Sequence, residues 1–168
     1  MGAMQRRKGG DGEREIAALV RDLTGWDVRR RVRQHEGDSD LEGVPGWCVE
    51  VKRHARATRA DVRGWWEQTV RQAASDGLLP VLFWRQDRDE WRGVWPVALL
   101  LGVQCAQTWM AYALSVEGTV EAWAAVARNI NASSCPRYSV RWKVATAISD
   151  LGNPSSVEAF DRCDTRVE

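Results

Sequence analysis

Asp40, Glu50 and Lys52 combine residue types and a spacing that suit chemistry on phosphates. The run "WCVEVKRH" (47–54) alternates like a β-strand, which places Glu50 and Lys52 on one face and two valines on the other. Asp40 lies in a second short strand, 39–43, which would pair with the first as a hairpin and bring the two carboxylates together. A half-exposed strand with a Glu–Lys pair on its wet side explains the same alternation, so the strand alone does not decide.

The chemistry follows from the charges of these three residues. Two neighbouring carboxylates repel each other unless a cation or a proton lies between them. Oxygen ligands of this kind suit Mg²⁺, and Mn²⁺ is expected to substitute for it. A lysine beside such a metal can orient an attacking water and stabilise charge that develops on a phosphate. The layout Asp40-x9-Glu50-x-Lys52 therefore supplies the parts for phosphodiester hydrolysis.

The segments that would position these residues alternate between helix and strand. Their order, α-β-β-β-α-β-β, predicts a mixed α/β fold around one central sheet, with the apolar "LPVLFWRQ" at its centre and a hairpin to the strand that follows. A further helix is expected at 119–129 with Thr119 as its cap, and 138–148 reads as a strand running into a helix. The first seven elements are predicted at 11–24, 26–33, 39–43, 47–53, 59–75, 79–86 and 91–97.

The first helix offers two acidic residues to the same centre. Glu13 and Glu15 border opposite edges of an apolar stripe that includes Ile16 and Val20, so the helical wheel does not choose between them. An acidic first turn is also what the helix macrodipole favours without any further role.

The charge distribution, the cysteines and the apolar segments limit the classes of protein to which this chain can belong. The net charge is only +1, but basic residues crowd two stretches, 29–33 and 52–63, on either side of several acids. This layout suits a surface that holds phosphates around an acidic pocket, and it also suits ordinary surface charge. The four cysteines form no C-x-x-C pair, which argues against zinc and disulfides. Because we find no signal peptide, and "ALLLGV" (98–103) is too short to span a bilayer, we expect no membrane association and a cytoplasmic protein of a bacterium or a phage-infected host.

The motifs in order resemble the archaeal-type Holliday junction resolvases of the PD-(D/E)xK nuclease superfamily. "RRKGGDGERE" matches the family's Lys-Gly, short spacer and Glu-Arg at a helix start, "SDLEG" its Asp-Leu strand and "WCVEVKR" its Glu-Val-Lys strand. By motif, Lys8–Gly9 and Glu13–Arg14 correspond to the family's residues, which selects Glu13 over Glu15. The resemblance covers roughly residues 6–97.

The resemblance implies a restriction-endonuclease-like fold and a Mg²⁺-dependent endonuclease that resolves four-way junctions as a homodimer and leaves nicks with 5′-phosphates. Glu13, Asp40 and Glu50, with the Val51 carbonyl, would hold the metal, and Lys52 would position the water. The residues expected to grip DNA phosphates are Lys8, Arg14, Arg30, Arg31, Arg33, Arg53 and Arg56.

Two alternatives remain. A restriction-like or repair nuclease acting on duplex ends, flaps or nicks would use the same metal centre. A non-catalytic DNA-binding protein with this fold would be expected to lack Asp40, Glu50 or Lys52, and all three are present.

The chain is accordingly divided into a basic N-terminal arm (1–10), a nuclease core (11–98), a C-terminal helical extension (99–132) and a mobile tail (133–168) without assigned chemistry.

Some residues depart from the family's pattern or fit it only loosely. Ser39 stands where the family usually has proline or an apolar residue before its Asp. Related nucleases sometimes carry a supporting glutamine on the second helix, but Gln68 and Gln72 both lie off its apolar face and are not placed in the site. Trp65 and Trp66 fall on that face and are predicted to pack rather than to stack on bases.

Overall fold

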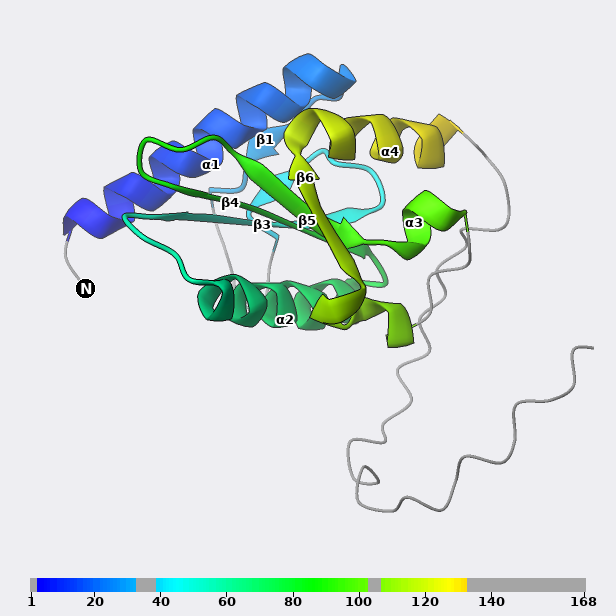
Figure 1. Cartoon of the computed structure of the whole chain (residues 1–168). Helices are drawn as coiled ribbons and strands as arrows, with labels where there is room; N and C mark the ends of the chain where they lie inside the picture. Colours follow the sequence, from blue (N-terminus) through cyan, green and yellow to red (C-terminus); the bar gives the residue numbers. More distant parts are fainter. Residues whose placement is uncertain (1–2, 33–38, 103–106, 133–168) are drawn as a thin grey trace, which may run out of the picture.

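The computed structural model describes residues 3–32, 39–102 and 107–132. A central sheet is covered on one face by α1 (Ala3–Thr24) and α4 (Val120–Ala132) and on the other by α2 (Arg59–Asp76), as Figure 1 shows. This is the mixed α/β sheet flanked by helices that the sequence predicts.

The sheet has the strand order β3-β4-β5-β6. β3 (Trp47–His54) runs parallel to β4 (Leu79–Gln86), which pairs antiparallel with β5 (Arg92–Pro96) as the predicted hairpin. β6 (Ser115–Thr119) adds an antiparallel edge beyond β5. The apolar β4 is therefore an interior strand, and β3, which carries Glu50 and Lys52, lies at an edge of the sheet.

Apolar side chains fill both faces of this sheet. On the α1 side, Ile16 and Val20 are fully buried in one cluster with Val49 and Phe83. On the α2 side, Trp66 is fully buried and its indole N–H donates to the Met110 carbonyl at 2.8 Å. Trp66 therefore packs as predicted, whereas Trp65 is only partly buried and stacks on His54 with ring centroids 4.6 Å apart.

The second helix begins and ends close to its predicted limits. Thr58 caps its N-terminus: the hydroxyl accepts from the Asp61 N–H at 3.2 Å, while the Asp61 carboxylate accepts from the Thr58 N–H at 2.8 Å. Gly77 ends it in the left-handed conformation, with φ at 66°.

The first helix begins at Ala3, not near residue 11, so the limit drawn at residue 10 for a basic arm falls inside α1. Glycines weaken a helix, which is why this stretch suggests a loop in the sequence. Close packing accounts for one of these glycines, Gly12. A Cβ at Gly12 would lie 3.3 Å from the Arg53 Cβ and 3.4 Å from the Trp91 ring, so a small residue lets α1 approach the sheet.

The segment between the first two helices is less regular than predicted. Among the described residues 26–32 of the expected strand, Arg29–Arg30 form β1, and Val32 is 83% exposed. The strand expected at 39–43 is reduced to β2 (Leu41–Glu42), which pairs with β1 and not with β3 as a regular hairpin. Just before β2, the Asp40 N–H donates to the Val49 carbonyl at 2.8 Å, which connects this segment to β3.

Residues 98–132 contain more than a helical extension. α3 (Ala98–Leu101) and two 3₁₀ turns, η1 (Gln107–Met110) and η2 (Tyr112–Leu114), lead into β6, which belongs to the central sheet. The predicted helix at 119–129 is confirmed as α4, and the Ala122 N–H donates to the Thr119 hydroxyl at 3.2 Å. The expected strand and helix at 138–148 and the tail at 133–168 lie outside the described residues. Within the described part of the chain, no helix combines the length and apolarity needed to cross a membrane.

Candidate active site

Ser39 and Asp40 are anchored directly to β3. The buried Ser39 hydroxyl accepts from the Val49 N–H at 2.9 Å and lies within donating distance of the Leu41 and Val49 carbonyls, at 2.8 and 3.2 Å. Serine at this position, a departure from the family's pattern, therefore supplies hydrogen bonds that proline or an apolar residue does not. These bonds place the Asp40 segment alongside the edge strand.

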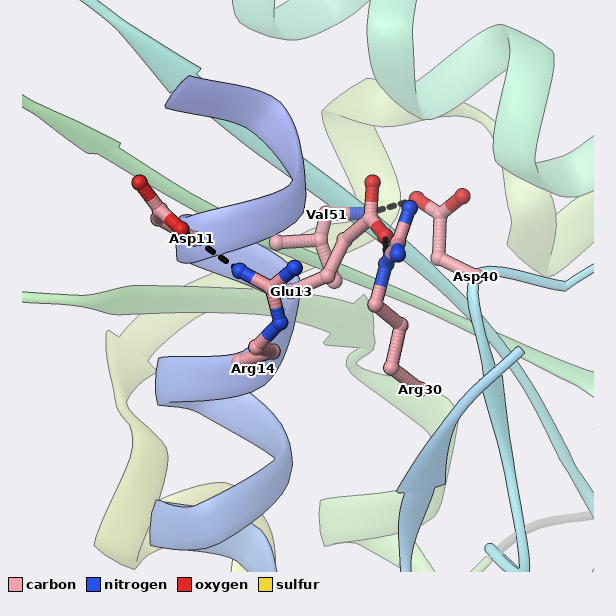
Figure 2. A network of polar contacts seen from close by, with 6 residues as sticks. All are labelled: Asp11, Glu13, Arg14, Arg30, Asp40 and Val51. Atoms are coloured by element: carbon pink, nitrogen blue, oxygen red, sulfur yellow. Dashed lines mark hydrogen bonds and ion pairs between the residues drawn. The ribbon is translucent and has the colours of Figure 1, made fainter. Parts of the chain in front are cut away.

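The Asp40 carboxylate faces the middle of β3. Its Oδ2 accepts a hydrogen bond from the Val51 N–H at 2.7 Å (Figure 2). Burial raises the pKa of Asp40 to about 7, and the nearby Glu50 carboxylate acts in the same direction, while the Val51 N–H favours the ionised form. The predicted proximity of Asp40 and Glu50 is thus present, although no regular hairpin produces it.

Glu50 is a buried carboxylate with two polar contacts. It forms an ion pair with Lys52, its neighbour on the same face of β3, and it accepts a hydrogen bond from the Gln68 side chain of α2 at 3.3 Å. Burying a carboxylate is costly unless it is paired and hydrogen-bonded, so these contacts stabilise Glu50 in place. The helical wheel did not place Gln68 in the site. A wheel identifies the side of a helix that faces the core, and it contains no information about which side of α2 lies next to β3.

Glu13 reaches the same region from α1. Its carboxylate is ion-paired with the guanidinium of Arg30 on β1, and Figure 2 shows this pair beside Asp40 and Val51. The Glu13 charge also contributes to the raised pKa of Asp40. Glu15, the alternative on the same helix, is instead ion-paired with Arg85 at 2.6 Å. The structure therefore places Glu13 and not Glu15 near Asp40.

The oxygen atoms around Asp40 are of the type that binds a hard divalent cation. Asp40, Glu50 and Glu13 offer carboxylate oxygens, and Val51 offers a backbone carbonyl next to the N–H that Asp40 binds. Among the described residues, no three acidic, histidine or cysteine side chains are close enough to form a ready-made metal cluster. In this structure Lys52 is ion-paired with Glu50, and Arg30 is ion-paired with Glu13. The oxygen ligands therefore fit a divalent metal, and two of the carboxylates already have a cationic side chain beside them.

The residues predicted to grip DNA lie in different surroundings. Arg14 is exposed and paired with Asp11 at 2.6 Å, and Arg53, on the opposite face of β3 from Lys52, lies 3.5 Å from Asp87. Arg56 is exposed in the loop before α2, and the Arg31 N–H donates to the Asp40 carbonyl at 3.0 Å. Lys8 lies on α1 but its side chain is outside the described part, as is Arg33 entirely.

Comparison with known proteins identifies the family to which the chain belongs. Residues 4–122 match the model of the family described as "Phage putative PDDEXK endonuclease". The chain belongs to this family. It is therefore a nuclease of the PD-(D/E)xK type, as the motifs predicted, a class that generally uses divalent metals. The match extends beyond residue 97, where the motif resemblance ends, and includes β6.

The chain was also compared with solved structures and with curated proteins. The chain is similar to the solved structure of Hjc, a Holliday junction resolvase of the archaeal hyperthermophile Archaeoglobus fulgidus, with a TM-score of 0.43 and 17% identity over 70% of this chain and 96% of that chain. No curated protein matches the chain.

Proposed function

We propose that this nuclease is a Mg²⁺-dependent DNA endonuclease that resolves four-way junctions by paired phosphodiester hydrolysis. The observation that carries the hydrolytic part is the meeting of the Asp40 and Glu50 carboxylates with Lys52 at the edge strand β3. The preference for junctions is supported by the order of the Lys-Gly, Glu-Arg, Asp-Leu and Glu-Val-Lys motifs in the sequence.

Each residue of the centre would have a distinct role in hydrolysis. Asp40, Glu50, Glu13 and the Val51 carbonyl would hold the cation, and Asp40 would give up its proton on becoming a ligand. A bound divalent cation supplies positive charge to the phosphate and lowers the pKa of water. Lys52 would orient the attacking water and stabilise charge on the phosphoryl oxygens. As the water oxygen bonds to phosphorus it loses a proton to solvent, the P–O3′ bond breaks, and the 3′ oxygen takes a proton from solvent.

A homodimer is part of the proposal. A four-way junction has two equivalent strands to cut, and a two-fold protein dimer presents two identical sites related by the same symmetry. Each protomer would contribute one complete set of Glu13, Asp40, Glu50 and Lys52. Contacts to phosphates by arginines would make binding largely independent of sequence and sensitive to salt.

The test is cleavage of a labelled, immobile four-way junction beside a linear duplex, a flap and a nicked duplex. Each DNA is incubated with Mg²⁺, with Mn²⁺ and with EDTA, using the wild type, Asp40→Ala and the control Asp22→Ala, which removes an exposed carboxylate of α1. Paired symmetric nicks in the junction alone, abolished by EDTA and by Asp40→Ala only, are expected.

The other outcomes separate the alternatives. Metal-dependent cutting of duplex, flap or nicked DNA in preference to the junction would keep the hydrolytic centre and replace the substrate with that of a restriction-like or repair nuclease. Binding without cutting of any DNA, in every metal, would contradict catalysis and favour a DNA-binding role for the fold.

A further inference from the structure

A groove separate from the Asp40–Glu50 centre lies between the first turns of α2 and the η2–β6 segment. Its volume is about 670 Å³, within the size range of ligand sites in proteins. Arg59 and Arg63 line it from α2, Tyr112 from η2, and Ser115 and Glu117 from β6. The walls thus combine two guanidinium groups, two hydroxyl groups and one carboxylate.

The charges in this groove favour an anion. Arg59 is exposed and forms no ion pair within the described parts of the chain. Arg63 pairs with Glu67 at 3.0 Å, but both side chains are largely exposed, so this pair is weak and easily exchanged. The one acidic wall residue, Glu117, already has a cation in Arg92 at 3.2 Å. A ligand therefore meets at least one uncompensated positive charge.

Tyr112 gives the groove a donor beside these cations. Burial raises the pKa of Tyr112, and Glu117 acts in the same direction while Arg59 opposes it, so the phenol lies close to both charges. It stays protonated at neutral pH and can donate to a phosphate oxygen. The Ser115 hydroxyl already donates to the Tyr112 carbonyl at 2.7 Å and is left as an acceptor.

The groove is continuous in sequence with the basic stretch that begins at Lys52. From there Arg53, Arg56, Arg59 and Arg63 lead from the end of β3 through the loop and onto α2. Gln68 contacts Glu50 nine residues further along α2 from Arg59, which corresponds to about 14 Å of helix axis. The groove also borders β6, which lies at the opposite edge of the sheet from β3, so it is separate from the centre that Glu50 and Lys52 would form.

We infer that this groove binds a backbone phosphate of the DNA substrate away from the scissile phosphate, with Arg59 and Arg63 as its cations and Tyr112 as its neutral donor. The inference rests on the proposed function for the identity of the substrate. Two backbone contacts on one protomer, separated along α2, would fix the direction in which the DNA leaves the cleavage centre.

Binding without metal tests the groove independently of cleavage. Junction affinity is measured in EDTA as a function of salt for the wild type, Arg59→Ala, Tyr112→Phe and Arg71→Ala, an exposed arginine of α2 outside the groove. Losing one phosphate contact should lower the salt slope by about 0.9, equivalent to about eightfold weaker binding at 0.1 M salt. We expect this loss in Arg59→Ala, a smaller loss in Tyr112→Phe and none in Arg71→Ala. Equal behaviour of Arg59→Ala and Arg71→Ala would overturn the inference.

Position is tested by shortening the DNA. About 14 Å corresponds to roughly four base pairs, so a substrate ending within that distance of the mapped cut on the relevant side cannot reach the groove. The Arg59→Ala penalty should disappear for that substrate, and the single-turnover cleavage rate at saturating protein should equal that of the wild type. A penalty that persists on DNA shortened on both sides, or a reduced rate at saturation, would overturn the placement. Cleavage by the wild type with no Arg59 effect would contradict the groove alone, whereas a wild type that binds no DNA would contradict the proposed function as well.

Discussion

The Asp40 carboxylate and the Val51 N–H form a 2.7 Å hydrogen bond that joins the segment before β2 to the middle of β3. This bond lies between the two carboxylates of the centre, since Val51 directly follows Glu50 in the strand. It fixes Asp40 beside Glu50 in spite of their repulsion. Much of the chemistry proposed for the chain depends on how this fixed pair responds to protons, cations and neighbouring side chains.

Asp40 should make the metal-free protein less stable as the pH rises. Its pKa is raised by burial to about 7 from an ordinary value of 3.8, so the folded state holds this proton over a range where the unfolded state has lost it. The contribution of Asp40 to stability is therefore greatest below about pH 4 and falls as the pH rises to about 7. We expect Asp40→Asn to remove this loss, raising Tm in EDTA at pH 8 by several degrees and little at pH 4.

The measurement is a thermal unfolding series in EDTA from pH 4 to pH 8. Asp22→Asn, on the exposed side of α1, is the matched control and should follow the wild type at every pH. A Tm difference between Asp40→Asn and the wild type that does not grow with pH would show that the Asp40 carboxyl is not held protonated by its surroundings.

Ser39 should contribute to both stability and activity. In Ser39→Ala the Val49 N–H loses its hydroxyl acceptor inside the protein, which costs about 1–3 kcal/mol for a buried donor. The Asp40 segment also loses an anchor to β3, so the cleavage rate should fall. Denaturant unfolding and single-turnover cleavage measure the two effects. Ser75→Ala, which removes a hydroxyl bonded to the Gln72 carbonyl on the exposed side of α2, should change neither.

Arg30 should contribute more to the stability of the metal-free protein than to that of the metal-loaded protein. Arg30→Met leaves the mostly buried Glu13 carboxylate without its ion-pair partner, which should destabilise the protein by about 1–3 kcal/mol in EDTA. Mg²⁺ should recover more stability in the variant than in the wild type, because a cation near Glu13 then replaces the lost charge. Thermal unfolding with and without Mg²⁺ checks this. Arg29→Met, which removes an exposed pair with Asp27, is the control, and the same Mg²⁺ response in both variants would contradict the expectation.

Gln68 should act on cleavage through Glu50. Residues that hold a metal ligand typically change metal affinity or activity by about 10- to 100-fold when replaced. We expect a loss of this size in Gln68→Leu, with a higher Mg²⁺ requirement, because Glu50 loses the side-chain donor at 3.3 Å. Gln72→Leu, one turn further along α2, should have little effect on the Mg²⁺ requirement. Unchanged Mg²⁺ dependence in Gln68→Leu would exclude this positioning role.

The sequence predicts the parts of this protein that depend on local patterns. The alternation in 47–54, the apolar run 79–86 and the helical period of 59–75 lead to β3, β4 and α2 with nearly correct limits. The residues Asp40, Glu50 and Lys52 could be selected because their side-chain chemistry and spacing are visible in the sequence. The structure brings Asp40 close to Glu50, and the roles of the three residues stay predictions.

Tertiary packing decides the parts that the sequence did not predict. The glycines at 9 and 10 suggested a loop before residue 11, whereas α1 begins at Ala3. In β6, an ideal Cβ at Gly118 would lie only 2.9 Å from the Trp95 ring. The five residues of β6 carry no clear alternation, so their pairing with β5 had no local signal. Gln68 was missed for the same reason: its role depends on the edge strand beside α2, which a helical wheel does not contain.

Single-turnover nicking of a junction shows whether Asp40 and Glu50 form a metal-dependent hydrolytic centre with Lys52, as we propose. The rate is measured with Mg²⁺ and with EDTA for the wild type, Asp40→Asn, Lys52→Met and the control Asp22→Asn, after confirming that all four bind the DNA in EDTA. We predict Mg²⁺-dependent nicking by the wild type and the control, and at least about a hundredfold loss in the other two variants. Nicking by Asp40→Asn and Lys52→Met at the rate of the wild type, or full activity in EDTA, would show that these residues do not form such a centre.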